Sequence, residues 1–547
     1  MYSSSSKSKI QSNGSNTAIF FAIFVAGVTI RLFHLIYNRS LWMDEVYLST
    51  SLVKMSANEL VSSPLYYQQK APIGFLLAVK FFVYQFGNKE IFLRIFPLIS
   101  GILSMLIFIP VSRYFLKNQA ALLAFTIFCF SPALVYHSVE VKQYSTELLG
   151  TMLSLFLFIK FKDEKYINSL IFWGITGGII LWFSYASVFI LGGIGIGVSI
   201  YHLLKKNWSV FFISLIPFSI WLTSFAINYL LFTHKHAESQ WIVYWFRAYD
   251  NFMPFPPKSI GGLKWFAMNF YRMLDYPLGL LWNFGAVTKY QGLNMIFKMP
   301  LLPMLLLIIG FCITIKKKSA ETSLILLIPI ALTFLASGLE LYPLTERFWV
   351  FIAPVFIIIL GIGFEYLSFK FKSKVLSNLI FVLLIIGPVF GSIGSFITAE
   401  NFYLHKTSSQ REALSYINKN YSKDDAVYVY WNNLPGFRLY NNMYKYNFKA
   451  TEGTDQRYSS KNYEEYYHNL HNDFSEISKH RRVWLVYNTK FLTDIGDKID
   501  TPDWYYTKNL SPTDHLLKEF LKTHKPLKKY VTKDIAVYLL EFKPKKR

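Results

Sequence analysis

Apolar residues fall into long blocks that recur from about residue 17 to about residue 397. A helix of about 20 residues spans the hydrocarbon layer of a membrane and pairs its own backbone polar groups there. The blocks lie at about 17–37, 92–112, 119–137, 146–161, 167–183, 186–204, 209–232, 297–315, 322–340, 347–366 and 376–397. The sequence therefore predicts a polytopic α-helical membrane protein with about eleven transmembrane helices.

The chain carries a net charge of +23, which can indicate a nucleic-acid partner. No nucleic-acid-binding motif is recognisable, however, and much of the excess lies in short loops between apolar blocks. The loops on one side hold fifteen basic residues: Lys7, Lys9, Arg113, Lys117, Lys160, Lys162, Lys165, Lys205, Lys206, Lys316, Lys317, Lys318, Lys370, Lys372 and Lys374. The positive-inside rule then places the N-terminus in the cytoplasm. The charge predicts topology and contact with membrane lipids, and no nucleic-acid partner.

The blocks also divide the chain into parts. Residues 1–16 are a serine-rich tail, too long and polar for a cleaved signal, which we expect in the cytoplasm. Residues 17–400 form the membrane core. Two long outer segments belong to it: residues 38–90, with helices at the membrane interface, and the aromatic-rich loop 233–296, which we expect to lie on the membrane.

Residues 401–547 are charged, rich in Tyr and Asn, and contain no apolar block long enough to span a membrane. We expect helices at about 409–419 and 513–523, and strands at about 426–431, 483–487 and 535–542. This mixture predicts a small α/β domain. An odd number of spans puts the two ends of the chain on opposite sides, so the domain is expected in the periplasm.

Five short polar stretches lie at the outer ends of the expected spans. They are Leu41-Trp42-Met43-Asp44-Glu45, Gln69-Lys70-Ala71-Pro72, Arg94 at the start of the second span, Glu140-Val141-Lys142-Gln143-Tyr144 and Tyr342-Pro343-Leu344-Thr345-Glu346-Arg347. An isolated acidic pair is more often the hydrated end of a loop than a chemical site. Here carboxylates, cations and aromatic rings gather on one side of the membrane, and this clustering favours a functional site.

Together the five stretches resemble the membrane-embedded glycosyltransferases of the GT-C class. The nearer resemblance is to the bacterial family 39-like branch, related to protein mannosyltransferases and to the aminoarabinose transferase of lipid A. It covers roughly residues 17–400. The resemblance implies an inner-membrane enzyme that moves a sugar, with inversion, from a polyprenyl-phosphate donor to an envelope acceptor on the periplasmic side. The acceptor could be lipid A, a polysaccharide or a protein.

The motif match implies that Asp44 is the general base, or that it orients the acceptor, and that Glu45 assists through a hydrogen bond or a metal contact. The alternative for Glu45 is a solvated neighbour. The donor phosphate needs cations nearby. The candidates are Lys70, Arg94, Lys142 and Arg347, although each could instead extend to lipid headgroups.

Glu140 begins a possible helical row with Tyr144 and Glu147, so that the three side chains could face one cavity. We take Glu140, Tyr144 and Tyr342 as candidates for substrate binding. The alternative is that these polar residues only form the first turn of a helix and bind no substrate.

The sequence leaves open whether the protein holds a divalent metal cofactor. In the aminoarabinose transferase branch a glutamate that helps to hold a metal precedes the Lys-Pro motif, whereas this chain has Gln69 there. His137, His234 and His236 lack the spacing of a zinc site, and we expect them at the membrane interface.

Two other classes of function stay open: a transporter or flippase for lipid-linked glycans, and a non-catalytic membrane scaffold that binds glycans. No charge at mid-depth of a span and no inverted repeat is visible, which counts against a transporter.

Overall fold

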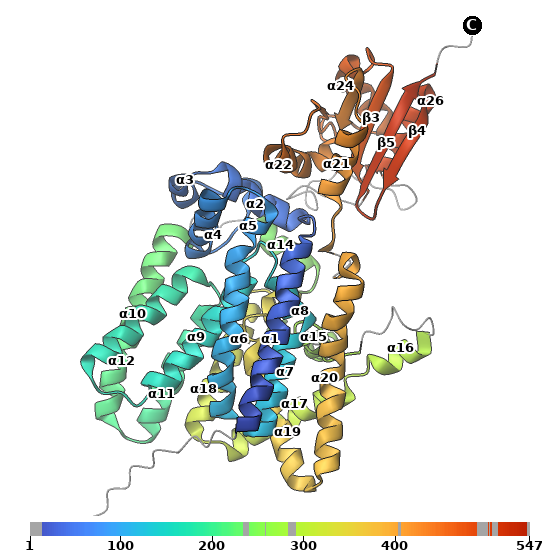
Figure 1. Cartoon of the computed structure of the whole chain (residues 1–547). Helices are drawn as coiled ribbons and strands as arrows, with labels where there is room; N and C mark the ends of the chain where they lie inside the picture. The colour runs from blue at the N-terminus through green and yellow to red at the C-terminus, as the bar shows by residue number, and fades with distance from the viewer. Residues whose placement is uncertain are drawn as a thin grey trace, which may run out of the picture.

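The computed structural model describes residues 14–233, 240–257, 259–282, 291–402, 406–489, 502, 504–505 and 512–543. It has a helical bundle with a small sheet domain at one end (Figure 1). The expected position of His234 and His236 lies outside the described residues, as does most of the N-terminal tail.

A helix stands at each of the eleven expected spans. These helices are α1 (Gly14–Tyr37), α6 (Ile95–Phe115), α7 (Asn118–Phe130) continued by α8 (Pro132–His137), α9 (Tyr144–Phe161), α10 (Ile167–Phe183), α11 (Ser187–Leu204), α12 (Trp208–Asn228), α17 (Leu301–Lys317), α18 (Ala320–Gly338), α19 (Ala353–Phe371) and α20 (Lys374–Ile397). The polytopic helical fold is therefore confirmed.

Within the described residues, nine helices are long and apolar enough to cross a membrane, two fewer than expected. The two shorter ones are α7 and α10. In α7 the helix ends at Phe130, because Ser131 is extended and Pro132 starts the next helix. Residues 123–130 of α7 are all buried by neighbouring helices, so this segment does not need the length of a lipid-facing span.

Two glycines set the close approach of α17 and α19. A Cβ added to Gly310 would lie 2.0 Å from the carbonyl oxygen of Ile359, and one added to Gly363 would lie 2.0 Å from that of Leu306. Any larger residue would force the helices apart. The contact holds the middle of α19 against α17. The short helix η3 (Glu346–Trp349), which carries Arg347, precedes α19 in the chain.

The outer segment 38–90 folds into short helices, as expected. They are α2 (Met43–Lys54), α3 (Ala57–Ser62), η1 (Tyr66–Gln68), α4 (Ile73–Phe86) and α5 (Glu90–Leu93). Figure 1 shows α2 to α5 together at the end of the bundle that faces the sheet domain.

The segment 233–296 differs from the expected surface loop. It contains α14 (Gln240–Ala248), α15 (Ile260–Asp275) and α16 (Gln291–Phe297). Met273 and Leu274, at the end of α15, are fully buried in the same hydrophobic core as the spans. Their burial packs the end of α15 against the bundle, whereas the position of the segment relative to the membrane stays a prediction.

The C-terminal domain contains α21 (Gln410–Asn420), β1 (Asp425–Val429), α22 (Leu434–Tyr444), β2 (Thr451–Glu452), α23 (Tyr463–Asn469), α24 (His471–Ile477), β3 (Arg482–Asn488), α26 (Pro512–Thr523), β4 (His524–Val531) and β5 (Ile535–Phe542). The strand order is β2-β1-β3-β5-β4, with β1 parallel to β2 and β3, and β5 antiparallel to β3 and β4. This confirms the small α/β domain.

Strands β1, β3 and β5 match the expected strands, but the two edge strands, β2 and β4, were not expected. β2 has only two residues, and most residues of β4 are exposed. The sequence of β4 does not alternate between polar and apolar residues. Its lysines and Pro526 are typical of an edge strand that resists pairing with a further strand.

The domain docks on the outer segment through α21 and α22. Arg411 pairs with the fully buried Glu90 at 2.9 Å, and the hydroxyl of Tyr440 accepts a hydrogen bond of 2.8 Å from the backbone N–H of Leu41. Apolar residues from both sides form one shared hydrophobic cluster. The domain is therefore packed against the end of the bundle that carries α2 to α5.

Candidate active site

A cavity of about 1030 Å³ lies between the outer end of the bundle and the C-terminal domain. Six of the nine expected site residues line it: Asp44, Lys70, Lys142, Tyr144, Tyr342 and Arg347. Gln410, Gly436, Asn488 and Asp534 of the C-terminal domain line it as well. Segments that are far apart in the sequence thus meet at one site.

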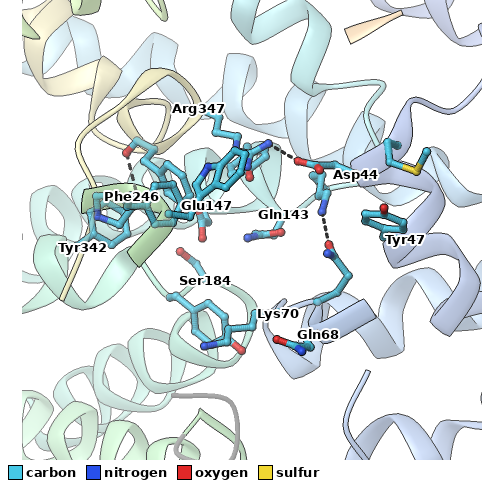
Figure 2. A pocket seen from close by; sticks show the side chains of 18 of the residues that line it. Asp44, Tyr47, Gln68, Lys70, Gln143, Glu147, Ser184, Phe246, Tyr342 and Arg347 are labelled. Carbon is cyan, nitrogen blue, oxygen red and sulfur yellow. Dashed lines mark hydrogen bonds and ion pairs between the residues drawn. The ribbon is translucent and has the colours of Figure 1, made fainter. Parts of the chain in front are cut away.

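Asp44 and Arg347 form an ion pair on the cavity wall (Figure 2). Asp44 lies in the first turn of α2, where the helix dipole favours a carboxylate. Burial would raise the pKa of Asp44, but the Arg347 and Lys142 cations outweigh it and hold this pKa below its ordinary value. The two side chains are 27% and 24% exposed, so both remain open to a ligand.

Aromatic rings hold the guanidinium of Arg347 in position. It lies 5.5 Å from the ring centroid of Phe348, 5.8 Å from that of Tyr144 and 6.0 Å from that of Trp42. The hydroxyl of Tyr342 donates to the carbonyl oxygen of Phe348 at 3.2 Å, which anchors the same loop. Tyr144 and Tyr342 therefore build the wall around the cation, beside any contact they make with a substrate.

Two further cations face the cavity. Lys142 is buried and donates to the amide oxygen of Gln69 at 2.7 Å, and its burial lowers its pKa. Lys70 is half-buried, and burial lowers its pKa too. With Arg347 these side chains can hold a phosphate group by charge-assisted hydrogen bonds.

The described residues of the cavity do not fit a metal site. Gln69 is the partner of Lys142, and Asp44 is paired with Arg347. In the part of the chain that the structure describes, no group of three or more His, Cys, Asp or Glu side chains is placed to hold a metal ion.

Glu45 and Arg94 do not line the cavity, in contrast to the expectation. Both are fully buried, and Arg94 Nη2 lies 3.2 Å from Glu45 Oε1. Glu45 also accepts a hydrogen bond of 2.9 Å from the backbone N–H of Val141, while Arg94 donates to the carbonyl oxygen of Arg39 at 2.7 Å. The pair joins three of the five polar stretches and thereby positions their cavity-facing neighbours.

Glu140 does not line the cavity either. It accepts hydrogen bonds from Trp42 Nε1 at 3.0 Å and from His137 Nδ1 at 2.6 Å. His137, expected at the membrane interface, is buried, and its other ring nitrogen contacts the hydroxyl of Tyr276. This chain of contacts fixes the indole of Trp42, two residues before Asp44.

Lys406, which follows the last span, was not expected at the site from the sequence. It is almost fully buried, with its ammonium group 5.6, 5.5 and 5.2 Å from the ring centroids of Trp42, Tyr136 and Tyr276. Only the tertiary fold brings it there, because no local pattern distinguishes it from an exposed lysine. Lys406 ties the linker of the C-terminal domain to the aromatic residues behind Asp44.

No family model matches the sequence, and no curated protein matches it either. Among solved structures, ArnT from Cupriavidus metallidurans bound to undecaprenyl phosphate superposes with a TM-score of 0.51 at 10% identity, over 95% of this chain and 97% of that chain. The chain has the fold of ArnT, a GT-C enzyme. The GT-C resemblance that the five polar stretches carry is thus confirmed for the fold, and the superposition includes the C-terminal domain.

Two further structures resemble this GT-C fold less closely. The apo form of ArnT from the same organism gives a TM-score of 0.49 at 10% identity, over 95% of this chain and 97% of that chain. An oligosaccharyltransferase from Archaeoglobus fulgidus, in complex with zinc and sulfate, gives 0.46 at 14% identity, over 94% of this chain and 72% of that chain.

Proposed function

We propose that the protein is a glycosyltransferase that moves a sugar from a polyprenyl-phosphate donor to an envelope acceptor: lipid A, a polysaccharide or a protein. One observation carries the proposal. A carboxylate, Asp44, and the cations Arg347, Lys142 and Lys70 face the same cavity at one end of a membrane bundle. The first can accept a proton, and the others can hold a phosphate leaving group. ArnT, with the same fold, has been solved with undecaprenyl phosphate bound.

In the proposed reaction the acceptor hydroxyl oxygen forms a bond with the anomeric carbon, while the bond between that carbon and the phosphate oxygen breaks. The phosphate keeps the electron pair, and Arg347 and Lys142 stabilise its charge. Asp44 takes the proton of the hydroxyl. A single displacement of this kind inverts the anomeric carbon. Because Asp44 pairs with Arg347 before the donor binds, the donor phosphate competes with Asp44 for the guanidinium and releases the base.

We place the cavity and residues 401–547 on the periplasmic side of the bacterial inner membrane, with residues 1–16 in the cytoplasm and residues 17–400 in the membrane. Basic loops at the other end of the bundle support this orientation. There Lys162 pairs with Glu321 at 2.7 Å, and Lys318 donates to the carbonyl oxygen of Phe115 at 3.3 Å. Nucleotide sugars are absent from the periplasm, so a lipid-linked donor fits this side.

The test uses purified protein in lipid nanodiscs with radiolabelled polyprenyl-phosphate sugars and an envelope extract as acceptor. We expect label to move from the lipid carrier to an acceptor with wild-type protein and not with Asp44→Asn. Proteoliposomes loaded with the same lipids test the transporter, which would move the carrier-linked sugar across the bilayer with the label still on the carrier. Binding without either event would indicate the scaffold.

A further inference from the structure

The cavity has a second group of polar side chains that the proposed reaction does not use. Gln143 and Glu147 come from the start of α9, and Ser184 from the end of α10. All three line the cavity, and Figure 2 shows them between Arg347 and Lys70.

Two members of this group, Glu147 and Gln143, have acceptor atoms without a partner among the described residues. Glu147 is 3% exposed, and its carboxylate makes no hydrogen bond or ion pair with any residue that the structure describes. The side-chain oxygen Oε1 of Gln143, a residue that is 8% exposed, is likewise without a hydrogen-bond partner. A buried acceptor without a partner costs stability. Ionisable residues at such positions in membrane proteins usually serve a ligand.

Ser184 adds a hydrogen-bond donor to the two acceptors. Its Oγ accepts hydrogen bonds from the backbone N–H of Ser187 at 3.1 Å and from the hydroxyl of Ser187 at 2.7 Å. With its acceptor capacity used in this way, Ser184 keeps its own O–H as a donor toward the cavity. The group therefore presents two acceptor side chains and one donor side chain to a ligand.

We infer that Glu147, Gln143 and Ser184 bind the hydroxyl groups of the transferred sugar, an inference that rests on the proposed function. Every sugar hydroxyl can donate one hydrogen bond and accept another, so neighbouring hydroxyls match a set that mixes acceptors with a donor.

The position of the group also fits the donor sugar. Arg347 lies against the ring of Tyr144, and Glu147 follows Tyr144 by three residues, on the same face of α9. A sugar attached to a phosphate that is held by Arg347 is therefore next to Glu147. Glu147 acts here as a residue that determines donor specificity, separate from the proton acceptor Asp44.

Affinities for bare undecaprenyl phosphate and for the same carrier linked to glucose, mannose or galactose test this inference. We expect wild-type protein to bind at least one glycosylated carrier more tightly than the bare one. Glu147→Gln, which keeps the size of the side chain, should weaken binding of that glycosylated carrier by about 10-fold, as expected for the loss of one hydrogen bond. Binding of the bare carrier should stay unchanged.

Ser154→Ala is the matched control. Ser154 is buried in the same helix, donates to the carbonyl oxygen of Gly150 at 2.7 Å and does not line the cavity. Its substitution should leave both affinities unchanged. Equal effects of Glu147→Gln on both carriers, or wild-type protein that binds every glycosylated carrier no better than the bare one, would overturn the sugar subsite. Wild-type protein that binds neither form would refute the proposed function itself.

Discussion

The substitution Asp44→Asn separates proton transfer from donor binding. Asparagine keeps the size of the side chain and one oxygen acceptor but cannot take up the proton of the acceptor hydroxyl. We expect the rate of sugar transfer to fall by ~10²-fold or more, the range for loss of a positioned acid or base.

The same substitution should increase the affinity for the donor. A hydrogen bond between charged groups contributes about 1.5–3 kcal/mol. Because Asp44 and Arg347 are 27% and 24% exposed, solvent screening reduces this contribution to about 1 kcal/mol. In the wild type the donor phosphate must displace Asp44 from Arg347. Without that competitor, donor affinity should rise by about 5-fold.

Donor affinity and single-turnover transfer, measured on protein inserted at wild-type levels, check both effects. Asp163→Asn is the matched control, because Asp163 is 88% exposed and does not line the cavity. Transfer by Asp44→Asn at a near wild-type rate would show that Asp44 is not the base. Weaker donor binding would show that the ion pair does not compete with the phosphate.

The Asp44 carboxylate also determines how sugar transfer depends on pH. Its pKa lies below the ordinary value of 3.8, so Asp44 is ionised and able to accept a proton at every pH above that value. This pKa belongs to the free protein, in which Asp44 pairs with Arg347, and kcat/KM reports the free protein. The value of kcat/KM should therefore show no loss on the acidic side until the pH falls below 3.8. Since the pKa is lowered in the folded state, the contribution of the ion pair to stability is present above the unfolded pKa and is lost as the pH falls through the folded one.

Three further outcomes are expected. Lys142→Ala should weaken donor binding by about 10-fold through loss of a phosphate contact, measured by the same affinity assay; unchanged affinity would exclude that contact. Arg411→Ala should lower the free energy of unfolding by about 3 kcal/mol, because it leaves the buried Glu90 without its cation; an unchanged thermal transition in detergent would contradict this. A reporter active only in the periplasm should work when fused after Arg547 and fail after Lys318, and the reverse pattern would refute the proposed orientation.

The membrane core could be predicted from the sequence because a bilayer imposes a length and a composition on every span. The exceptions are α7 and α10, which are shorter than the lipid-spanning helices. In α7 burial by protein removes the need for full length. Strand β4 was not predicted, because an exposed edge strand has no buried face and therefore no alternating apolar residues in its sequence.

In the candidate site, the sequence located the stretches but not which side chain of each faces the cavity. Asp44 and Glu45 are adjacent carboxylates, and only the position of Arg94 decides that Glu45 is the one that turns inward. Glu140 likewise accepts hydrogen bonds from Trp42 and His137, and no spacing in the sequence reveals these contacts. Lys406 depends wholly on contacts with distant residues.

The docking of the C-terminal domain has a consequence for biosynthesis. Asp44, Arg347 and Asp534 all line the cavity but leave the ribosome at very different times, because they lie far apart in the sequence. The cavity walls are complete only when the C-terminal domain has folded against α2. A nascent chain that has already inserted every span should thus lack part of its cavity wall until the C-terminal domain has been made and has folded.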